Sequence, residues 1–297
     1  VAFCVALLFL ANGGVVPLAE ATLSRHLTTA AGMDVGRYGR VRVWGSLGFV
    51  AAVMVFGVLY ERAGISLFPV VAVVAWAWLA LAARRLPASA EPPHGADATP
   101  AVWPVLRQPS VLWFFASVFF TVLAHTSQYT FFSLFLDSHG HGKQTVGLMW
   151  AVGAGVEVAF FWWQGRFFQR IGPYGWLQGA SLLAAVRFAG TAALGGQVWL
   201  LFALQALHAI TFAAHHAACI TLVTRHFPGA LRGRGQALYT VLGYGLSGVI
   251  GGVAGGWLSS HGGLEAVFWA AAAAAVAGGF CARRAAQTAS QAGLPAR

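Results

Sequence analysis

The feature that most constrains the fold is a series of apolar runs, each about as long as a bilayer is thick. A helix needs roughly 20 apolar residues to cross the hydrocarbon core of a membrane. The sequence contains nine such runs, bounded by Gly, Pro or charged residues, at 1–23, 43–61, 65–83, 110–136, 144–164, 174–194, 198–222, 236–258 and 264–282. It therefore predicts an all-α membrane protein with nine transmembrane helices.

The scarcity of charge supports the same prediction. Charged residues make up 9% of the chain and hydrophobic residues 58%, whereas a soluble domain carries about 25% charged residues. So few charges cannot cover a water-exposed surface, so lipid must cover much of this protein. Cys4, Cys219 and Cys281 lie far apart in apolar runs without a CxxC pair, and we expect them to be packing residues.

The basic residues between the spans predict the orientation, because Lys and Arg accumulate in short cytoplasmic loops. Of the 18 Lys and Arg residues, 15 fall on one side, Arg62 and Lys143 fall on the other, and Arg187 lies inside a span. We expect a bacterial inner-membrane protein with a cytoplasmic C-terminus and Val1 near the outer face. The net charge of +10 follows from this asymmetry, so it predicts contact with anionic lipid and requires no nucleic acid.

The longest break in hydrophobicity predicts the domain organisation. The segment PASAEPPHGADATP, residues 87–100, is rich in Pro, Ala and acidic residues, a composition typical of linkers. We expect four parts: a three-span remnant of an N-terminal bundle, a cytoplasmic linker, a six-helix C-terminal bundle and a cytoplasmic tail, at 1–86, 87–108, 109–284 and 285–297. The chain opens directly in an apolar run, so we expect a fragment of a protein with twelve spans in two halves.

Several local strings are similar to one known family. VPLAEATLSRHL, followed by YGRVRVWGSLGFV from Tyr38 to Val50, resembles the fourth and fifth helices of the phenylpropionate-transporter branch of the major facilitator superfamily. In that branch a PLxDA-type segment precedes a YGxxRxWGSxxF segment. GLMWAVGAGVEV and LFALQALHAITFAAHHAA resemble its eighth and tenth helices.

A degenerate loop motif adds to this resemblance. QGRFFQRIG, with Arg166 and Arg170, resembles the cytoplasmic loop motif GxxxDRxGR, although Gln169 stands at its acidic position. The resemblance implies the major facilitator fold, with nine of twelve helices present, and proton-coupled uptake of a small organic solute without a cofactor. The wider group includes symporters of the lactose permease type. We expect a secondary transporter, not an enzyme, that acts as a monomer on a small solute and protons.

Three ionisable residues inside the spans are candidates for proton coupling. At 1.5 Å per residue, Glu157, Arg187 and His208 lie ~20, ~11 and ~14 Å from the outer ends of their helices, so their side chains are expected to meet. An arginine near a desolvated carboxyl lowers the pKa that burial raises, and its displacement would release or bind a proton. In lactose-permease-type symporters a glutamate, an arginine and a histidine occupy the matching helices, with a further glutamate where this chain has Thr211. A static interhelical ion pair is the alternative.

Polar and aromatic stripes predict where a solute binds. Gln205, His208, Phe212, His215 and Cys219 recur at helical spacing and are expected to share one face. His216 is expected to form an interhelical hydrogen bond instead. The 110–136 helix shows a similar face, with Thr121, His125, Gln128 and Phe132 along one side and Tyr129 beside them. We predict solute contacts from His125, Gln128, Tyr129, Phe132, Gln205 and Phe212, with helix packing as the alternative.

The cytoplasmic ends of the helices carry a candidate gate. Glu20 matches the acidic residue of the PLxDA segment, and we expect it to pair with Arg25, Arg40 or Arg42 at the membrane boundary. A more specific prediction is that this ion pair breaks during the transport cycle and so acts as a gate. Arg166 and Arg170 of the loop motif complete the candidate gate residues.

Other classes of protein account for the histidines less well. A membrane metalloenzyme is the main rival, but His208 and His215 are about 10 Å apart along a helix, which is too far for one metal ion. The sequence shows no phosphate-binding glycine loop, nucleophile elbow or metal-binding set of cysteines. A receptor built on a transporter fold is a further alternative, as is a transporter of sugars or nucleosides.

Overall fold

The computed structural model describes residues 15–29, 32–85 and 101–293, and this part of the chain is almost wholly helical. The exception is a short antiparallel hairpin of two strands, β1 (Thr28–Thr29) and β2 (Gly32–Met33), in which Thr28 lies opposite Met33. The described residues divide into two compact units, and each is described by itself.

The smaller unit, within residues 44–98, contains the second part of helix α3 (Val35–Ala63), the short η1 (Ile65–Leu67) and α4 (Phe68–Arg84). The turn between α3 and α4 includes Gly64, whose φ of 83° is a left-handed conformation that suits glycine. Tyr60 contacts Phe56 and Phe68, so aromatic rings join the two helices at this turn.

The larger unit consists of residues 1–43 and 99–297. Its first part contains α2 (Val15–His26), the hairpin and the beginning of α3. Its second part is a helical bundle whose elements are α5 (Trp103–Leu106), α6 (Pro109–Ser138), α7 (Lys143–Trp163), η2 (Gln164–Arg166), α8 (Phe168–Ile171), α9 (Pro173–Ala193), α10 (Val198–Ala206), η3 (Ala209–Ala214), α11 (His215–His226), η4 (Gly229–Leu231), α12 (Arg232–Leu238), η5 (Tyr239–Leu246) and α13 (Ser247–Gln291).

Local chemistry explains several of the helix starts. The Asp34 carboxylate accepts a hydrogen bond from the backbone N–H of Arg37 at 2.9 Å and so caps α3. Pro109 and Pro173 stand at the first position of α6 and α9, where a proline loses no helical hydrogen bond.

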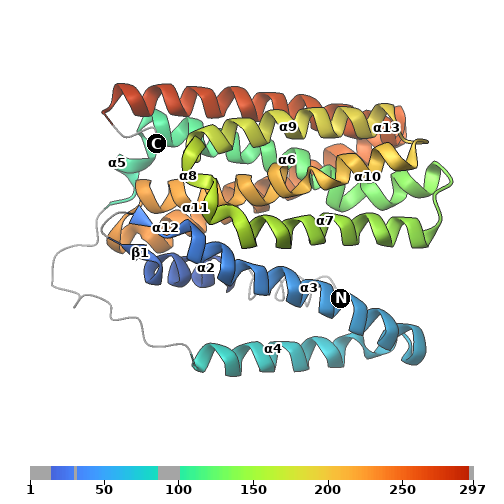
Figure 1. Cartoon of the computed structure of the whole chain (residues 1–297). Helices are drawn as coiled ribbons and strands as arrows, with labels where there is room; N and C mark the ends of the chain where they lie inside the picture. The colour runs from blue at the N-terminus through green and yellow to red at the C-terminus, as the bar shows by residue number, and fades with distance from the viewer. Residues whose placement is uncertain (1–14, 30–31, 86–100, 294–297) are drawn as a thin grey trace. The chain divides into compact units, whose positions relative to one another are not determined.

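The helices of the bundle lie side by side along their lengths (Figure 1). α13 packs against both α6 and α9, and α7 packs against α10 and η3. Gly263 interrupts α13 with a φ of 79°, so this element consists of two helices joined at a sharp turn. The predicted spans 236–258 and 264–282 fall on either side of that turn.

Four of the described helical segments are long and apolar enough to cross a membrane: Pro109–Ser138, Gln144–Arg166, Val198–His226 and Gly229–Gln291. Phe68–Arg84 is a shorter apolar helix. The all-α architecture is thus confirmed for the described residues, while the count of nine spans remains a prediction. Most of the predicted span 1–23, most of the linker 87–108 and the end of the tail 285–297 lie outside the described residues, and the predicted domain boundaries also remain predictions.

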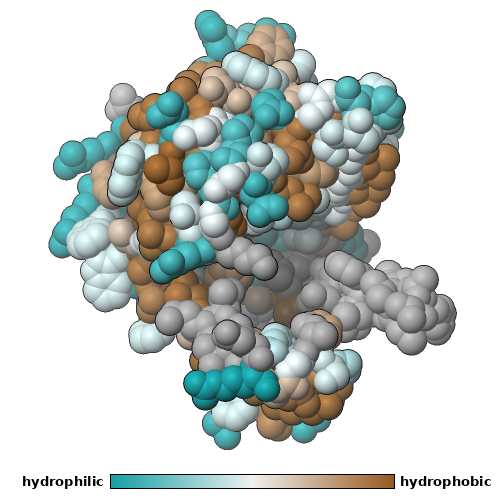
Figure 2. Space-filling model, turned by 90° about the vertical axis from the view of Figure 1, so that its right-hand side faces the viewer, coloured by the Kyte–Doolittle hydropathy of each residue, from teal (hydrophilic) through white to brown (hydrophobic). Residues whose placement is uncertain are grey.

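The outward faces of the bundle carry large apolar side chains, as a lipid-covered protein requires. Leu134, Val186, Trp199 and Val253 are all more than half exposed. Figure 2 looks onto one end of the bundle and shows hydrophilic residues scattered over that end, with hydrophobic residues towards the sides.

Two segments of π-helix interrupt helices of the bundle close to its buried polar residues. They are η3 (Ala209–Ala214), between α10 and α11, and η5 (Tyr239–Leu246), between α12 and α13. Hydrogen bonds in a π-helix run between residues five apart, which widens the turn and shifts every side chain that follows; such segments are frequent at functional sites.

Candidate functional site

Arg187, in α9, is the centre of a buried polar network and is 2% exposed. Its Nε donates to the carbonyl oxygen of Leu204 at 3.0 Å, and its Nη1 donates to Thr211 Oγ1 at 3.1 Å. Nη1 also lies 3.2 Å from His208 Nδ1, and Nη2 donates to Gln205 Oε1. These four acceptors are electrically neutral, so they hold the guanidinium in place without cancelling its charge.

The break between α10 and η3 creates part of this arrangement. α10 ends at Ala206, where the backbone N–H of Leu207 bonds to the Leu204 carbonyl in a tightened last turn. Carbonyls at a helix end have spare capacity as acceptors, and Arg187 uses that of Leu204. The break in the helix therefore supplies a hydrogen-bond acceptor for the buried arginine.

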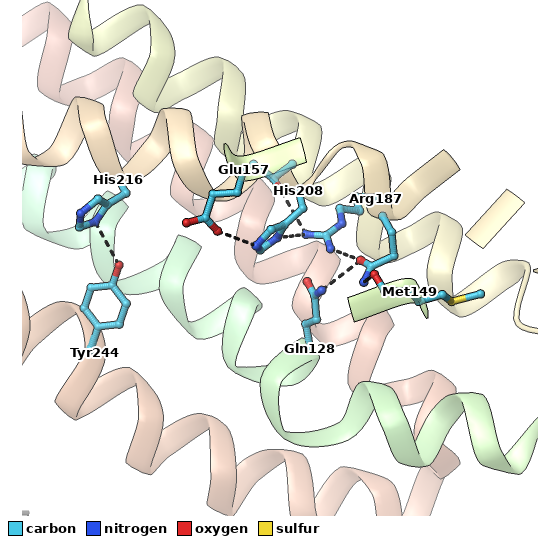
Figure 3. A network of polar contacts seen from close by, with 9 residues as sticks. Gln128, Met149, Glu157, Arg187, His208, His216 and Tyr244 are labelled. Atoms are coloured by element: carbon cyan, nitrogen blue, oxygen red, sulfur yellow. Dashed lines mark hydrogen bonds and ion pairs between the residues drawn. The ribbon is translucent and has the colours of Figure 1, made fainter. Parts of the chain in front are cut away.

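Two glutamines extend the network away from Arg187, and Gln128 is labelled in Figure 3. Gln128 Nε2, in α6, donates to Gln205 Oε1 at 3.0 Å, and Gln205 Nε2 donates to the carbonyl of Met149, in α7, at 3.3 Å. Gln128 Oε1 is buried and makes no hydrogen bond within the described structure. A hydroxyl or N–H group is the kind of donor that suits this acceptor.

His208 lies between Arg187 and Glu157 (Figure 3). Its Nδ1 faces the guanidinium, and its Nε2 is 3.7 Å from Glu157 Oε2. A guanidinium is only a donor, so Nδ1 must accept, and the proton of the neutral ring then lies on Nε2. That proton points to the Glu157 carboxylate. Sequence reasoning expected Glu157 and Arg187 to face one another; the structure places an imidazole between them.

His125, in α6, is buried beside this network. Its Nδ1 lies 2.8 Å from the carbonyl oxygen of Thr121, in the preceding turn. Its ring centroid is 6.4 Å from that of His208 and 5.9 Å from that of Phe212. The Nε2 atom makes no hydrogen bond within the described structure, so the ring leaves one nitrogen available.

Aromatic rings lie next to the polar network. Tyr129 stacks on Trp150 with centroids 6.1 Å apart and meets the edge of Phe212 at 6.0 Å. Phe132 packs edge-on against Trp150 at 5.8 Å. Tyr129 is half exposed. These rings from α6, α7 and η3 are suited to contact an apolar or aromatic group.

Glu20, in α2, contacts residues other than those the sequence favoured. Its Oε2 accepts a hydrogen bond from the Tyr38 hydroxyl at 3.2 Å, and its Oε1 lies 3.6 Å from Nε2 of His216, in α11. Arg42 is near enough to act on Glu20 electrostatically, and its guanidinium stacks on Phe161 at 5.5 Å. The remaining predicted gate residues are exposed: Arg40, Arg166 and Arg170.

The prediction of which residues share one face of the 198–222 helix is wrong in one respect. Regular α-helical spacing places His215 in line with His208 and Phe212, but His216 occupies that place. The rings of His208 and Phe212 stack at 5.0 Å, and those of Phe212 and His216 stack at 6.3 Å. The cause is η3, whose wider turn delays the return to the same face by one residue. His215 instead contacts Cys219. His216 does make an interhelical hydrogen bond, as expected, to Tyr239.

Sequence reasoning missed the contribution of Trp150, although it lies two turns before Glu157 on the same helix. It also missed Tyr38, Tyr239 and Tyr244 as partners in the buried contacts. An aromatic residue in an apolar run gives no signal that distinguishes a lipid contact from a site. For metal binding, the described residues contain no group of three or more His, Cys, Asp or Glu side chains placed to hold an ion.

These features define an integral membrane protein with a buried, charged network among its helices, where ionisable groups usually have a functional role. Comparison with known proteins agrees with that class. Residues 1–270 match the model of the MFS_1 like family, and the chain belongs to this family. The expected membership of the major facilitator superfamily is therefore confirmed.

Three curated relatives are transporters of this kind. A probable 3-phenylpropionic acid transporter of Escherichia coli (strain K12) is 28% identical over 248 residues, which cover 80% of this chain and 63% of the relative. A maltose permease of Geobacillus stearothermophilus is 26% identical over 260 residues, covering 86% and 64%. An uncharacterized transporter of Bacillus subtilis (strain 168) is 24% identical over 268 residues, covering 86% and 62%. The chain spans less than two thirds of the length of each relative.

Proposed function

We propose that this protein is a proton-coupled symporter of a small organic anion, with an aromatic carboxylate as the leading candidate. The observation that carries the proposal is the buried Arg187, held by four neutral acceptors beside a group of aromatic rings. A buried cation with no charge partner among those acceptors favours an anionic ligand. The phenylpropionic acid transporter among the relatives supports an aromatic one.

The network also supports a way of linking the solute to a proton. The guanidinium opposes protonation of His208 at Nδ1, because a protonated Nδ1 would point its N–H group at an N–H group of Arg187. A solute carboxylate that draws Arg187 away frees Nδ1 to take up a proton from water, and the resulting imidazolium then passes its Nε2 proton to Glu157 across the 3.7 Å gap. Solute and proton thus bind together, and release of either restores the contact between Arg187 and His208.

A sugar is the alternative solute. The amide groups of Gln128 and Gln205 suit hydroxyl groups, Gln128 Oε1 has no partner within the described structure, and one relative is a maltose permease. In either case we propose alternating access across a bacterial inner membrane with a cytoplasmic C-terminus. Uptake assays with aromatic carboxylates, sugars and nucleosides distinguish the candidates.

The test of proton coupling is the Glu157→Gln variant in proteoliposomes with an imposed pH gradient. Each pH unit is worth about 1.4 kcal/mol per proton, so two units can drive roughly hundredfold accumulation of a solute. We expect Glu157→Gln to lose accumulation above equilibrium while it retains solute exchange. Glu265→Gln, which changes a half-exposed carboxylate elsewhere, should accumulate solute normally. Uphill accumulation by Glu157→Gln would contradict the assignment.

A further inference from the structure

A second carboxylate and imidazole face one another outside the Arg187 network. Glu20 Oε1, in α2, lies 3.6 Å from Nε2 of His216, in α11. His216 is 6% exposed, and its Nε2 makes no hydrogen bond within the described structure. The Tyr38 hydroxyl donates to the other oxygen of Glu20. The contact therefore joins the helices near the start of the chain to the C-terminal bundle.

The opposite side of the His216 ring faces two phenols of η5. Nδ1 lies 2.9 Å from the Tyr239 hydroxyl and 3.5 Å from that of Tyr244, and the two hydroxyls are 3.2 Å apart. A phenol either donates or accepts a hydrogen bond. Tyr239 can therefore serve neutral His216 as a donor and protonated His216 as an acceptor, so the surroundings of Nδ1 tolerate both states of the ring.

The charged groups around this pair favour an ionised Glu20. Tyr38 donates a hydrogen bond to the carboxylate, and Arg42 acts on it as a positive charge. His215 adjoins His216 on its own helix but contacts Cys219. Imidazole is a side chain that can carry a proton on both ring nitrogens, so protonation of His216 would turn this contact into an ion pair.

The continuous helical stretch from His208 through η3 into α11 carries one imidazole of each contact. His208, Phe212 and His216 form a continuous column of stacked rings along η3. His208 faces Glu157 at one end of the column, and His216 faces Glu20 at the other. A change in the turns of η3 would therefore move both imidazoles.

We propose that Glu20 and His216 form a second proton-binding site, which holds α2 against α11 when His216 is protonated and lets them separate when it is neutral. We call this pair the α2–α11 latch. Protonation turns the contact into an attraction between an imidazolium and a carboxylate, so the latch is strong when the imidazole is protonated and weak when it is neutral. The proposal goes beyond proton coupling, because it concerns contact between the two groups of helices and requires no solute.

Alkylation of Cys219 can report on the latch. Cys219, on α11, is fully buried in a core cluster that also contains Leu27 and Tyr38, so separation of α2 from α11 should expose it. The rate of modification by N-ethylmaleimide is measured by peptide mass spectrometry for the wild type and for Glu20→Gln, at pH 6 and pH 8. The ratio of the two rates at each pH removes the intrinsic pH dependence of the thiol. Cys281, in α13, is the internal reference.

We expect the rate ratio of Glu20→Gln to wild type to be about tenfold at pH 6, because an opposite charge at this distance shifts a protonation equilibrium by at least that factor. At pH 8 the ratio should fall towards one. His216→Gln should behave in the same way, the double variant should show no further increase, and Glu265→Gln should match the wild type at both pH values. A ratio near one throughout, or an equal increase at both pH values, would overturn the proposal.

Discussion

At the scale of single residues, Arg187 shows how a membrane protein accommodates a buried charge. Its four described acceptors come from α10, η3 and the residues between them, and they use donors in different directions of the planar guanidinium. An ammonium group is a single point with three donors on a flexible stem and cannot reproduce that fork. The contact is therefore specific to arginine as well as to positive charge.

Arg187→Lys is expected to destabilise the protein even though it keeps the charge. Each buried acceptor that loses its donor costs about 1–3 kcal/mol, and lysine leaves at least one of the four without a partner. Thermal unfolding in detergent, followed by tryptophan fluorescence, should give a lower Tm. Arg283→Lys, at an exposed position, should unfold as the wild type does. An unchanged Tm for Arg187→Lys would show that the fork of donors contributes nothing.

At the scale of elements, glycines determine how closely α3 approaches the end of α7. A Cβ atom on Gly165, in η2, would lie 2.8 Å from the Cα of Gly36, and a Cβ on Gly39 would collide with the carbonyl of Phe161 and the side chain of Gln164. Backbone atoms cannot yield as a flexible side chain can. The first glycine of the degenerate loop motif is thus part of a contact between helices.

Gly165→Ala is expected to lower the free energy of unfolding by about 1–3 kcal/mol, the cost typical of overpacking. Gly155→Ala is the matched control, because its Cβ would meet nothing within 4 Å on the same helical segment. In a helix Ala is favoured over Gly by up to about 1 kcal/mol, so the control should be neutral or stabilising. Chemical denaturation of both variants measures the difference, and equal effects would exclude a steric origin.

At the scale of the whole molecule, the distribution of arginine predicts how the bundle lies in the membrane. The turn after α6, residues 139–142, and the turn at Gly263 both lie on the side that is poor in basic residues. The turn that contains η2 and α8 lies on the basic side, together with the end of α13. One orientation of the bundle in the membrane places the basic segments in the cytoplasm and the other two turns outside.

Fusions to reporter proteins test this orientation. Alkaline phosphatase, which is active only outside the cytoplasm, should be active when it is fused after Gly142 or Gly262. Green fluorescent protein should fluoresce when it is fused after Gly172 or Gly229. The two reporters exchanged between these sites serve as controls and should be inactive. The opposite pattern would place the C-terminus outside.

The sequence by itself determined the class of protein and the long apolar helices of the bundle, and it predicted that His208 lies near Arg187 and Glu157. Those properties depend on local hydropathy and on the high cost of charge in lipid, both of which can be read from neighbouring residues. Only the tertiary structure decided that His208 separates Glu157 from Arg187, that His216 replaces His215 in the ring column, and that Glu20 faces His216. These contacts depend on the π-helical turn of η3 and on the rotation of each helix about its axis, which the packing of distant segments sets.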